Sequence, residues 1–287
     1  MSTIIIKTLH SNEEFEEFIE LQRIVWNYND YRECVPSHML LAVSQSGGVI
    51  LGAYDNNKLV GMGFLMTGYL HKNGLYYHSH FVGIHPDYQH KGIGMMIKKA
   101  QYDKALSMGV NKITWTYDPL LGPNAQLNIR KLGAIVRNYK LNVYGETKST
   151  TNPDARIPSD RFWVEWLINT PRVKQRIEGN YPSVDLSYLD IKQVNEVEHT
   201  IAGFKKMVTF AKYPEEKNVF IEIPFDFQAI FDTDVELALD WRLKSREMFQ
   251  YYFSAGFVVI DFQTIQNDSG HKNIYRLTTR IEDIYED

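Results

Sequence analysis

One segment of the chain, residues 82–100, constrains the fold more than any other, because a strand pattern passes into a helix pattern across two closely spaced glycines. Residues 75–84 are rich in aromatic and β-branched side chains, as strands are. Apolar positions then recur at the spacing of one helix face, at Ile93, Met96, Ile97 and Ala100. A strand that enters a helix through Gly92 and Gly94 predicts a short loop whose backbone can approach a ligand closely.

The start of this predicted helix has the chemistry of a phosphate site. Its first backbone N–H groups are unpaired and lie at the positive end of the helix dipole, which suits a pyrophosphate. Nearby positive charge comes from Lys91, Lys98 and Lys99, in a chain whose formal net charge is −4. A dinucleotide-binding turn would need a third glycine where Ile97 stands, and a P-loop would need Gly-Lys-Ser/Thr, so both are excluded.

The motif Gln89-x-x-Gly92-x-Gly94 resembles the acyl-CoA motif of the GNAT superfamily of N-acyltransferases, Gln/Arg-x-x-Gly-x-Gly/Ala. The preceding residues 82–88 are similar to the strand that leads into that motif, and a predicted helix at 124–132, stopped by Gly133, is similar to the family's later helix. The resemblance covers about residues 3–145, half the chain, and implies acetyl-CoA or another acyl-CoA as co-substrate, with no metal.

The resemblance also implies where the cofactor binds. In the family, the strand before the motif carries a bulge, and its backbone N–H groups donate to the thioester carbonyl and to pantetheine. The cofactor-binding residues implied in this way are Phe81, Val82, Gly83, Ile84, Gln89, His90, Lys91, Gly92, Ile93, Gly94, Asn124 and Asn128. For the two asparagines, which lie one helical turn apart, helix capping or solvent exposure is the alternative.

Two histidines and one aspartate are candidates for the chemistry at the thioester. His78 and His80 alternate onto one face of the predicted strand, just before the expected bulge. We predict that His80 deprotonates an acceptor amine and that His78 contacts the substrate, with a purely structural role as the alternative. A metal role would need a third ligand, and no cysteine or histidine stands at the required spacing. Asp118 ends the strand 113–117, where it orients a base, holds an ammonium group or only forms a turn before Pro119.

One departure from the family concerns the general acid. The family often has a tyrosine four residues before the glycine of its last helix, whereas this chain has Ile129. A thiol with a pKa near 8.5 is a fair leaving group unaided, so the alternatives are an unassisted thiolate, Tyr139 or Tyr144 as the acid, or lost catalysis.

A charged pair follows the middle of the chain. Asp160 and Arg161 are candidate substrate-binding residues, because an arginine near an acyl-CoA site suggests a carboxylate on the acceptor or on the acyl group. The alternative is an ordinary ion pair at the protein surface.

The order of predicted elements indicates an α/β protein of the α+β type, with a mixed, mostly antiparallel GNAT-like sheet flanked by helices. Domains are expected at 1–147, which binds acyl-CoA, and at 148–287, an α/β part that packs on the first and helps to shape the acceptor site. The polar segment 148–160 is the expected linker. Because Gly133 and Gly256 each stand between a helix and a strand, a degenerate duplication of the first half is an open alternative.

The predicted function is transfer of an acetyl or short dicarboxylic acyl group, such as succinyl, from coenzyme A to a primary amine. An amino acid or other small metabolite is the favoured acceptor, and a protein is the alternative. A non-catalytic acyl-CoA-binding regulator is the competing class. The charge balance argues against nucleic acid as a partner, and no apolar run reaches membrane-spanning length. The single Cys34 fits a reducing compartment, so a cytoplasmic protein is expected, with a homodimer left open.

Overall fold

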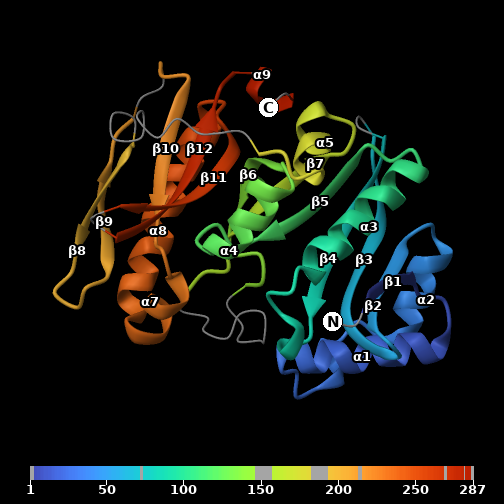
Figure 1. The fold of residues 1–287 in the computed structure, drawn as a ribbon. Helices are drawn as coiled ribbons and strands as arrows, with labels where there is room; N and C mark the ends of the chain where they lie inside the picture. The colour runs from blue at the N-terminus through green and yellow to red at the C-terminus, as the bar shows by residue number, and fades with distance from the viewer. Residues whose placement is uncertain are drawn as a thin grey trace. The chain divides into compact units, whose positions relative to one another are not determined.

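The computed structural model describes residues 3–71, 74–145, 157–181, 193–212, 215–267, 270–280 and 282–285 (Figure 1). The chain divides into two compact units, Met1–Trp115 and Thr116–Asp287. The boundary expected at 147 lies outside the described residues, as does most of the expected linker. The extent of any independently folding part, and the packing of a second part on the first, stay predictions.

The first helix of the first unit is one that the sequence predicts. Ser11 accepts a hydrogen bond from the Glu14 backbone and Glu14 returns one to the Ser11 backbone, which is a capping box. The elements of this unit are β1 (Ile4–Thr8), α1 (Asn12–Trp26), α2 (Ser37–Gln45), β2 (Val49–Asp55), β3 (Lys58–Leu70), β4 (Gly74–Ile84), α3 (Ile93–Ser107) and the first part of β5 (Lys112–Tyr117).

The strands of the first unit follow the order β1-β2-β3-β4-β5. All neighbours are antiparallel except β4 and β5, which are parallel. Those two pair only at Tyr77↔Ile113 and His78↔Thr114, and beyond these pairs the strands part (Figure 1). A gap in strand pairing of this kind leaves backbone available to a ligand.

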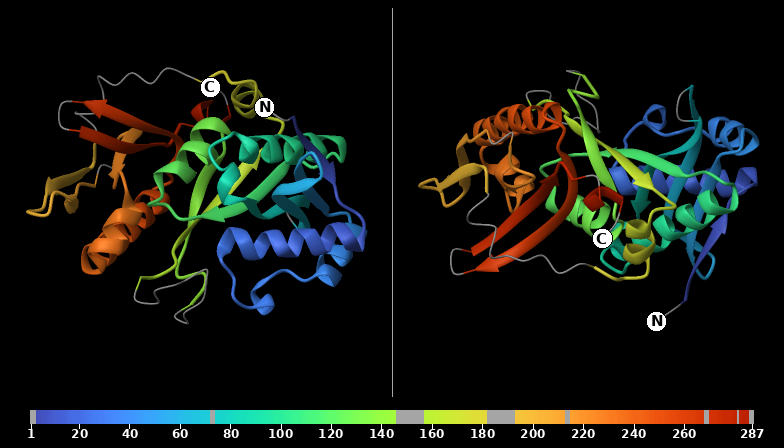
Figure 2. Two further views of the ribbon diagram at one scale, coloured as in Figure 1. Left: turned by 60° about the horizontal axis from the view of Figure 1, so that its bottom comes forward. Right: turned by 90° about the horizontal axis from the view of Figure 1, so that it is seen from above.

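Helices cover both faces of this sheet (Figure 2). On one face, Met62 and Phe64 of β3 pack with Phe15 and Phe18 of α1 in a single apolar cluster. On the other face, a Cβ at Gly61 or Gly63 would lie 3.0 Å from a side chain of α3, so these glycines allow the close approach of α3. The expected fold class, a mostly antiparallel mixed sheet flanked by helices, is confirmed.

The second unit contains a five-stranded antiparallel arrangement in the order β7-β6-β11-β12-β10 and a separate β8–β9 hairpin. Its elements are α4 (Gly122–Ala125), a π-helical turn (Gln126–Lys131), β6 (Ile135–Lys140), β7 (Arg161–Leu167), α5 (Pro171–Ile177), β8 (Asn195–His199), β9 (Lys205–Phe210), β10 (Asn218–Ile223), α7 (Phe227–Thr233), α8 (Val235–Ser254), β11 (Val258–Asn267), β12 (Gly270–Thr278) and α9 (Glu282–Tyr285). The helix expected at 124–132 is therefore π-wound over most of its length.

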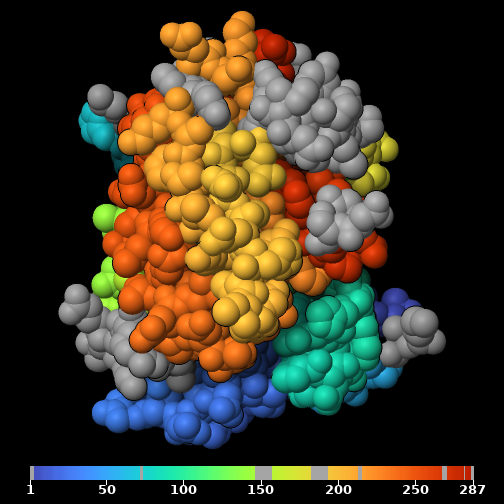
Figure 3. Space-filling view, turned by 90° about the vertical axis from the view of Figure 1, so that its left-hand side faces the viewer, coloured from blue at the N-terminus to red at the C-terminus, as the bar shows by residue number. Residues whose placement is uncertain are grey.

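The core of the second unit forms between its strands and α8. Alternate residues of β7 are buried, as the sequence predicts, with Phe162 and Trp166 fully enclosed. On α8, Trp241 donates through its indole N–H to the Lys205 carbonyl at 2.7 Å, so the β8–β9 hairpin lies on the surface beside this helix (Figure 3). A degenerate duplication of the first half stays a prediction. None of the helices in the described part has the length and apolar character needed to cross a membrane.

Candidate active site

The glycine loop leads from β4 into α3 as the sequence predicts. Gly92 is the N-cap of α3 with φ +79°, and no side chain caps the helix there. A Cβ built at Gly92 or Gly94 would have nothing within 4 Å, so open space lies beside the first turn of the helix. The uncapped backbone N–H groups of this turn are therefore free to bind an anion.

Short local hydrogen bonds hold the loop in shape before it reaches Gly92. The Tyr88 backbone donates to the His85 carbonyl at 2.8 Å, and Gln89 donates to the Pro86 carbonyl at 3.2 Å. Lys91 donates to the Asp87 carbonyl at 2.7 Å and lies over the Tyr88 ring. His90 has a φ of +60°, a left-handed conformation that side chains other than glycine seldom adopt. The loop is thus held by its own backbone, with its glycines left facing open space.

The bulge in β4 lies one residue earlier than expected. Phe81 pairs with Phe64 and Ser79 pairs with Leu65, which leaves His80 as the extra residue on β4. The expectation of a bulge at residues 81–84, with His80 before it, is corrected: His80 is itself the bulged residue. Because a bulge changes the alternation of side chains, His80 and Phe81 both contact the Phe64 ring, at centroid distances of 5.1 and 5.0 Å.

The two histidines of β4 have different surroundings. Nδ1 of the half-buried His78 is 3.0 Å from the Thr114 hydroxyl, and burial, with the charges of His80 and Lys98, lowers its pKa to about 4. The exposed His80 ring lies against Phe64 and Phe81, and this partial desolvation lowers its pKa as well. Both imidazoles are therefore neutral near pH 7. The described residues contain no group of three potential metal ligands.

A buried lysine lies on the opposite face of β4. Lys98 of α3 is 4% exposed, and its Nζ donates to the Ser79 hydroxyl at 3.1 Å and lies 3.8 Å from the centre of the Trp115 ring. Burial lowers its pKa to about 7. The sequence analysis counted Lys98 as local positive charge around the helix start, and this is wrong, because the helix turns its side chain into the core between α3 and the sheet.

We expect Lys98→Met to raise the free energy of unfolding near pH 7 by about 2 kcal/mol, because a buried polar group without full compensation destabilises the native state. The unfolded chain has a lysine pKa of about 10.4, so between about pH 7 and 10 it binds more protons than the native state does. Parent stability therefore rises with pH across this range, and the variant loses that slope.

Urea unfolding of both proteins near neutral pH and near pH 9 measures this difference. The control is Lys99→Met, at the exposed neighbouring position, which should change stability by less than about 0.5 kcal/mol. If the Lys98→Met protein is less stable than the parent at both pH values, burial of the ammonium does not lower the free energy of unfolding.

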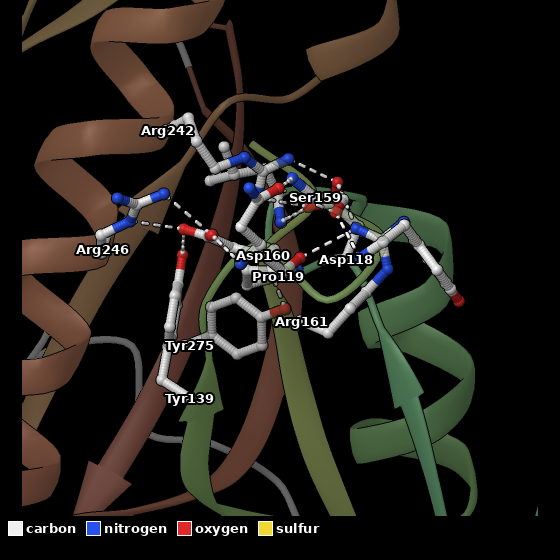
Figure 4. A network of polar contacts seen from close by, with 12 residues as sticks. Asp118, Pro119, Tyr139, Ser159, Asp160, Arg161, Arg242, Arg246 and Tyr275 are labelled. Carbon is white, nitrogen blue, oxygen red and sulfur yellow. Dashed lines mark hydrogen bonds and ion pairs between the residues drawn. The ribbon is translucent and has the colours of Figure 1, made fainter. Parts of the chain in front are cut away.

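A second cluster of candidate residues lies within the second unit (Figure 4). Asp118, which follows β5, accepts a hydrogen bond from Nη1 of Arg242 at 2.9 Å and lies 3.6 Å from Nη1 of Arg161. Its other oxygen is bonded to Nη2 of Arg242. Burial alone would raise the pKa of Asp118, but the two arginines and the Leu120 N–H hold it below its ordinary value. Asp118 is therefore an anion that orients arginines rather than a group ready to accept a proton.

The carboxylate of Asp160 is fully buried, and both of its oxygens accept hydrogen bonds. Arg246 donates to its two oxygens at 2.8 and 2.9 Å, Tyr139 donates at 3.0 Å, and the Asn142 N–H donates at 2.9 Å. Asp160 therefore forms a buried ion pair with Arg246, and the ion pair at the protein surface that the sequence left open does not form. Asp160 thus positions its neighbours, whereas Arg161 next to it keeps a partly exposed guanidinium stacked over Tyr144, at 5.0 Å.

The cluster as a whole carries more positive than negative charge. Its members are Asp118, Asp160, Arg161, Arg242 and Arg246, so the formal balance is two negative charges against three positive ones. Nε of Arg242 is buried and has no hydrogen-bond partner in the described part of the chain. A site with an excess guanidinium suits a carboxylate or phosphate ligand.

Arg242 and Arg246 were missed by the sequence analysis, although a signal was present. Arg242 lies on the same stripe of α8 as the buried residues Ala238, Trp241 and Ser245, and a charged residue on such a stripe usually has a buried partner. Arg246 follows one helical turn later.

The remaining candidates are placed as follows. Ile129 is fully buried in the core, and the hydroxyl of Tyr139 is engaged with Asp160, while Tyr144 is exposed. Asn124 is exposed and Asn128 is buried, so the two asparagines do not share one environment.

The fold and the loop define an α/β protein with an uncapped helix start that suits a phosphate-bearing ligand. Residues 11–127 match the model of the acetyltransferase (GNAT) family, so this part of the chain is a GNAT acetyltransferase domain. No curated protein matches the chain.

Several solved structures are similar to the chain. The ribosomal-protein-S18-alanine N-acetyltransferase of Escherichia coli is 14% identical, with a TM-score of 0.45 over 58% of this chain and 94% of that one. The acetyltransferase yncA of Salmonella typhimurium, solved with acetyl-CoA, is 15% identical, with a TM-score of 0.45 over the same shares. The PaiA N-acetyltransferase of Thermoplasma acidophilum, in complex with coenzyme A, is 20% identical, with a TM-score of 0.39 over 57% of this chain and 98% of that one.

Proposed function

We propose that the chain transfers an acetyl or other short acyl group from coenzyme A to a primary amine of an amino acid or other small metabolite. The observation that carries this proposal is the uncapped start of α3 at Gly92, which a short loop joins to a strand whose bulge holds His80. The open space beside Gly92 and Gly94 fits a pyrophosphate bound by backbone N–H groups. Gln89 to Gly94 would hold the cofactor.

The proposed transfer needs only one catalytic group from the protein, a base that accepts the proton of the amine. Bound acyl-CoA would supply a thioester carbonyl that a neutral amine attacks. As the C–N bond forms and the C–S bond breaks, the amine loses a proton, and we assign its acceptance to the neutral ring of His80, directly or through a water. Coenzyme A leaves as a thiolate, which needs no acid because its thiol has a pKa near 8.5. This removes the need for a tyrosine at position 129.

The arginine cluster supports a charged substrate. We propose that Arg161, one of two partly exposed arginines in a cluster with one excess positive charge, binds a carboxylate on the acceptor or on a dicarboxylic acyl group such as succinyl. Cytoplasmic location also remains a proposal, and the lone buried Cys34 supports a reducing compartment.

Incubation with labelled acetyl-CoA and a mixture of amines tests the function. Label that appears in an amide product supports the transferase. Tight binding of acetyl-CoA without any transfer would instead favour a non-catalytic acyl-CoA-binding regulator, the second candidate, which the buried Ile129 supports.

The glycine loop gives a separate binding prediction. Gly94→Val should weaken coenzyme A binding at least about tenfold, or 1.4 kcal/mol. Gly94 has no positive φ and its Cβ would meet nothing within 4 Å, so the variant can fold, while its side chain occupies the space expected for the pyrophosphate. Calorimetric titration with coenzyme A measures the effect.

The matched control is Leu106→Val, which places the same β-branched residue at an exposed position near the other end of α3. It should leave coenzyme A affinity unchanged. Equal affinities for the parent and the folded Gly94→Val protein would remove the loop from the cofactor site.

A further inference from the structure

A pocket of about 380 Å³ lies in the second unit, and its lining includes none of the residues assigned above to acyl transfer. Its walls come from the start of α4, from the residues around the start of α7, and from the facing side chains of β11 and β12. A volume of this size is ordinary for a small-molecule site. A Cβ at Gly122 would lie 2.3 Å from the Asn273 amide, so the glycine allows the start of α4 to close one side of the pocket.

On one side of the pocket, the hydrogen-bond donors of the side chains are bonded to acceptors of the protein itself. The Thr264 hydroxyl donates to the Asn273 carbonyl oxygen at 2.7 Å. The Asn273 amide nitrogen donates to the carbonyl oxygens of Pro224 and Phe225, each at 3.1 Å. This wall therefore presents acceptor lone pairs to the pocket, and a ligand bound there must itself donate hydrogen bonds.

Two further lining groups are acceptors as well. Oε1 of Gln126 is buried and has no partner among the described residues, although a buried acceptor normally has one. Asp226 accepts a hydrogen bond from the Ala229 N–H through Oδ1 at 2.9 Å, and its other oxygen forms no ion pair in the described part of the chain. The charge of Asp226 favours a donor whichever way the Gln126 amide is turned.

Charge and aromatic rings point to the same ligand class. Asp226 is the only charged residue among the described lining residues, so the pocket has a formal charge of −1. Phe225 and Phe227 contribute aromatic surface, and Phe225 is 51% exposed. An aromatic face attracts a cation, and a nearby carboxylate strengthens the binding of an ammonium group.

We propose that this pocket binds a small organic cation, a primary ammonium group carried on an apolar body. The ammonium donates to Asp226 and to the Gln126 carbonyl oxygen, while the apolar body lies against Phe225 and Phe227. The inference does not depend on acyl transfer, because it concerns equilibrium binding without coenzyme A.

Calorimetric titration of the full chain with three probes of similar shape tests the proposal. The probes are 2-phenylethylammonium, neutral 2-phenylethanol and anionic 3-phenylpropionate. We expect saturable binding of the ammonium and at least about tenfold weaker binding of the other two. No saturable binding of the ammonium at millimolar concentrations, or equal binding of the anion, would overturn the proposal.

Asp226→Asn provides the test on the protein side. Asparagine caps a helix about as well as aspartate, so the start of α7 should persist and thermal denaturation should show a folded protein. Ammonium binding should weaken at least about tenfold. The matched control is Asp234→Asn, since Asp234 caps α8 through the same kind of bond, to the Leu237 N–H at 2.9 Å, and does not line the pocket. Similar affinities in the two variants would contradict the proposal.

Discussion

His80→Gln is expected to lower the rate of acyl transfer about a hundredfold, the effect typical of removing a general base. Glutamine keeps the approximate size and the hydrogen-bonding capacity of the ring but cannot accept a proton from the amine. The bulge places His80 on β4 where the strand parts from β5, and its exposed ring packs against Phe64 and Phe81, so the variant should fold. Steady-state kinetics with acetyl-CoA and a saturating amine measure the loss.

The pH profile distinguishes a base from a residue that only supports the fold. Desolvation holds the pKa of His80 below the ordinary value of about 6.5. The base is therefore active at neutral pH, and kcat at a saturating amine concentration should fall as the pH drops through that lowered pKa. This part of the acid limb should be absent in His80→Gln.

His78→Gln is the matched comparison on the same strand. With a pKa of about 4 and a bond to Thr114, His78 is a weaker base, and its loss should affect turnover much less. Turnover of His80→Gln within about threefold of the parent would assign His80 to structure. A chain of waters would then be the remaining candidate for the base, since Asp118 is held as an anion by Arg242 and Arg161.

Asp118→Asn is expected to destabilise the protein by about 3–5 kcal/mol, since it leaves the buried guanidinium of Arg242 without its counter-charge. The Arg242 side chain is 2% exposed and is bonded to both oxygens of Asp118. Chemical denaturation monitored by circular dichroism measures the change. The double variant Asp118→Asn, Arg242→Met should recover part of the loss, because the uncompensated charge is then absent.

The pH dependence gives an independent check. The native pKa of Asp118 lies below the unfolded value of about 3.9, so its contribution to stability is present above that value and is lost as the pH falls. Asp118→Asn should therefore flatten the acid limb of the stability curve. A loss of stability under about 1 kcal/mol at neutral pH would contradict this account, because solvent would then be screening the charge of Arg242.

Local patterns in the sequence were enough to predict several elements. The capping box at Ser11 and Glu14 predicts the start of α1, and the glycines at 92 and 94 predict the junction between β4 and α3. These signals work because caps and left-handed turns depend on residues within one helical turn.

The buried face of α3 was predicted only in part. Ile93 and Ile97 are buried as expected, but Met96 is exposed and Lys98 and Gln101 are buried instead. The rotation of a helix on its sheet depends on which side chains lie beneath it. Here the apolar side chains of α3 pack over Gly61 and Gly63, and its buried polar side chains form hydrogen bonds with Ser79. Neither contact can be recognised from the sequence of the helix alone.

The sequence by itself determined the cofactor motif, the GNAT-type order of elements in the first half, and the candidacy of His78, His80, Asp118 and Arg161. Only the tertiary structure decided that the bulge falls on His80, because a bulge is a property of the register between two strands. It alone also joined Asp118 to Arg242 and Asp160 to Arg246, which are 124 and 86 residues apart in sequence. A charged residue can be recognised in the sequence at any position, but tertiary packing decides which residue it pairs with. The pairing is needed because burying an unpaired ion costs too much free energy.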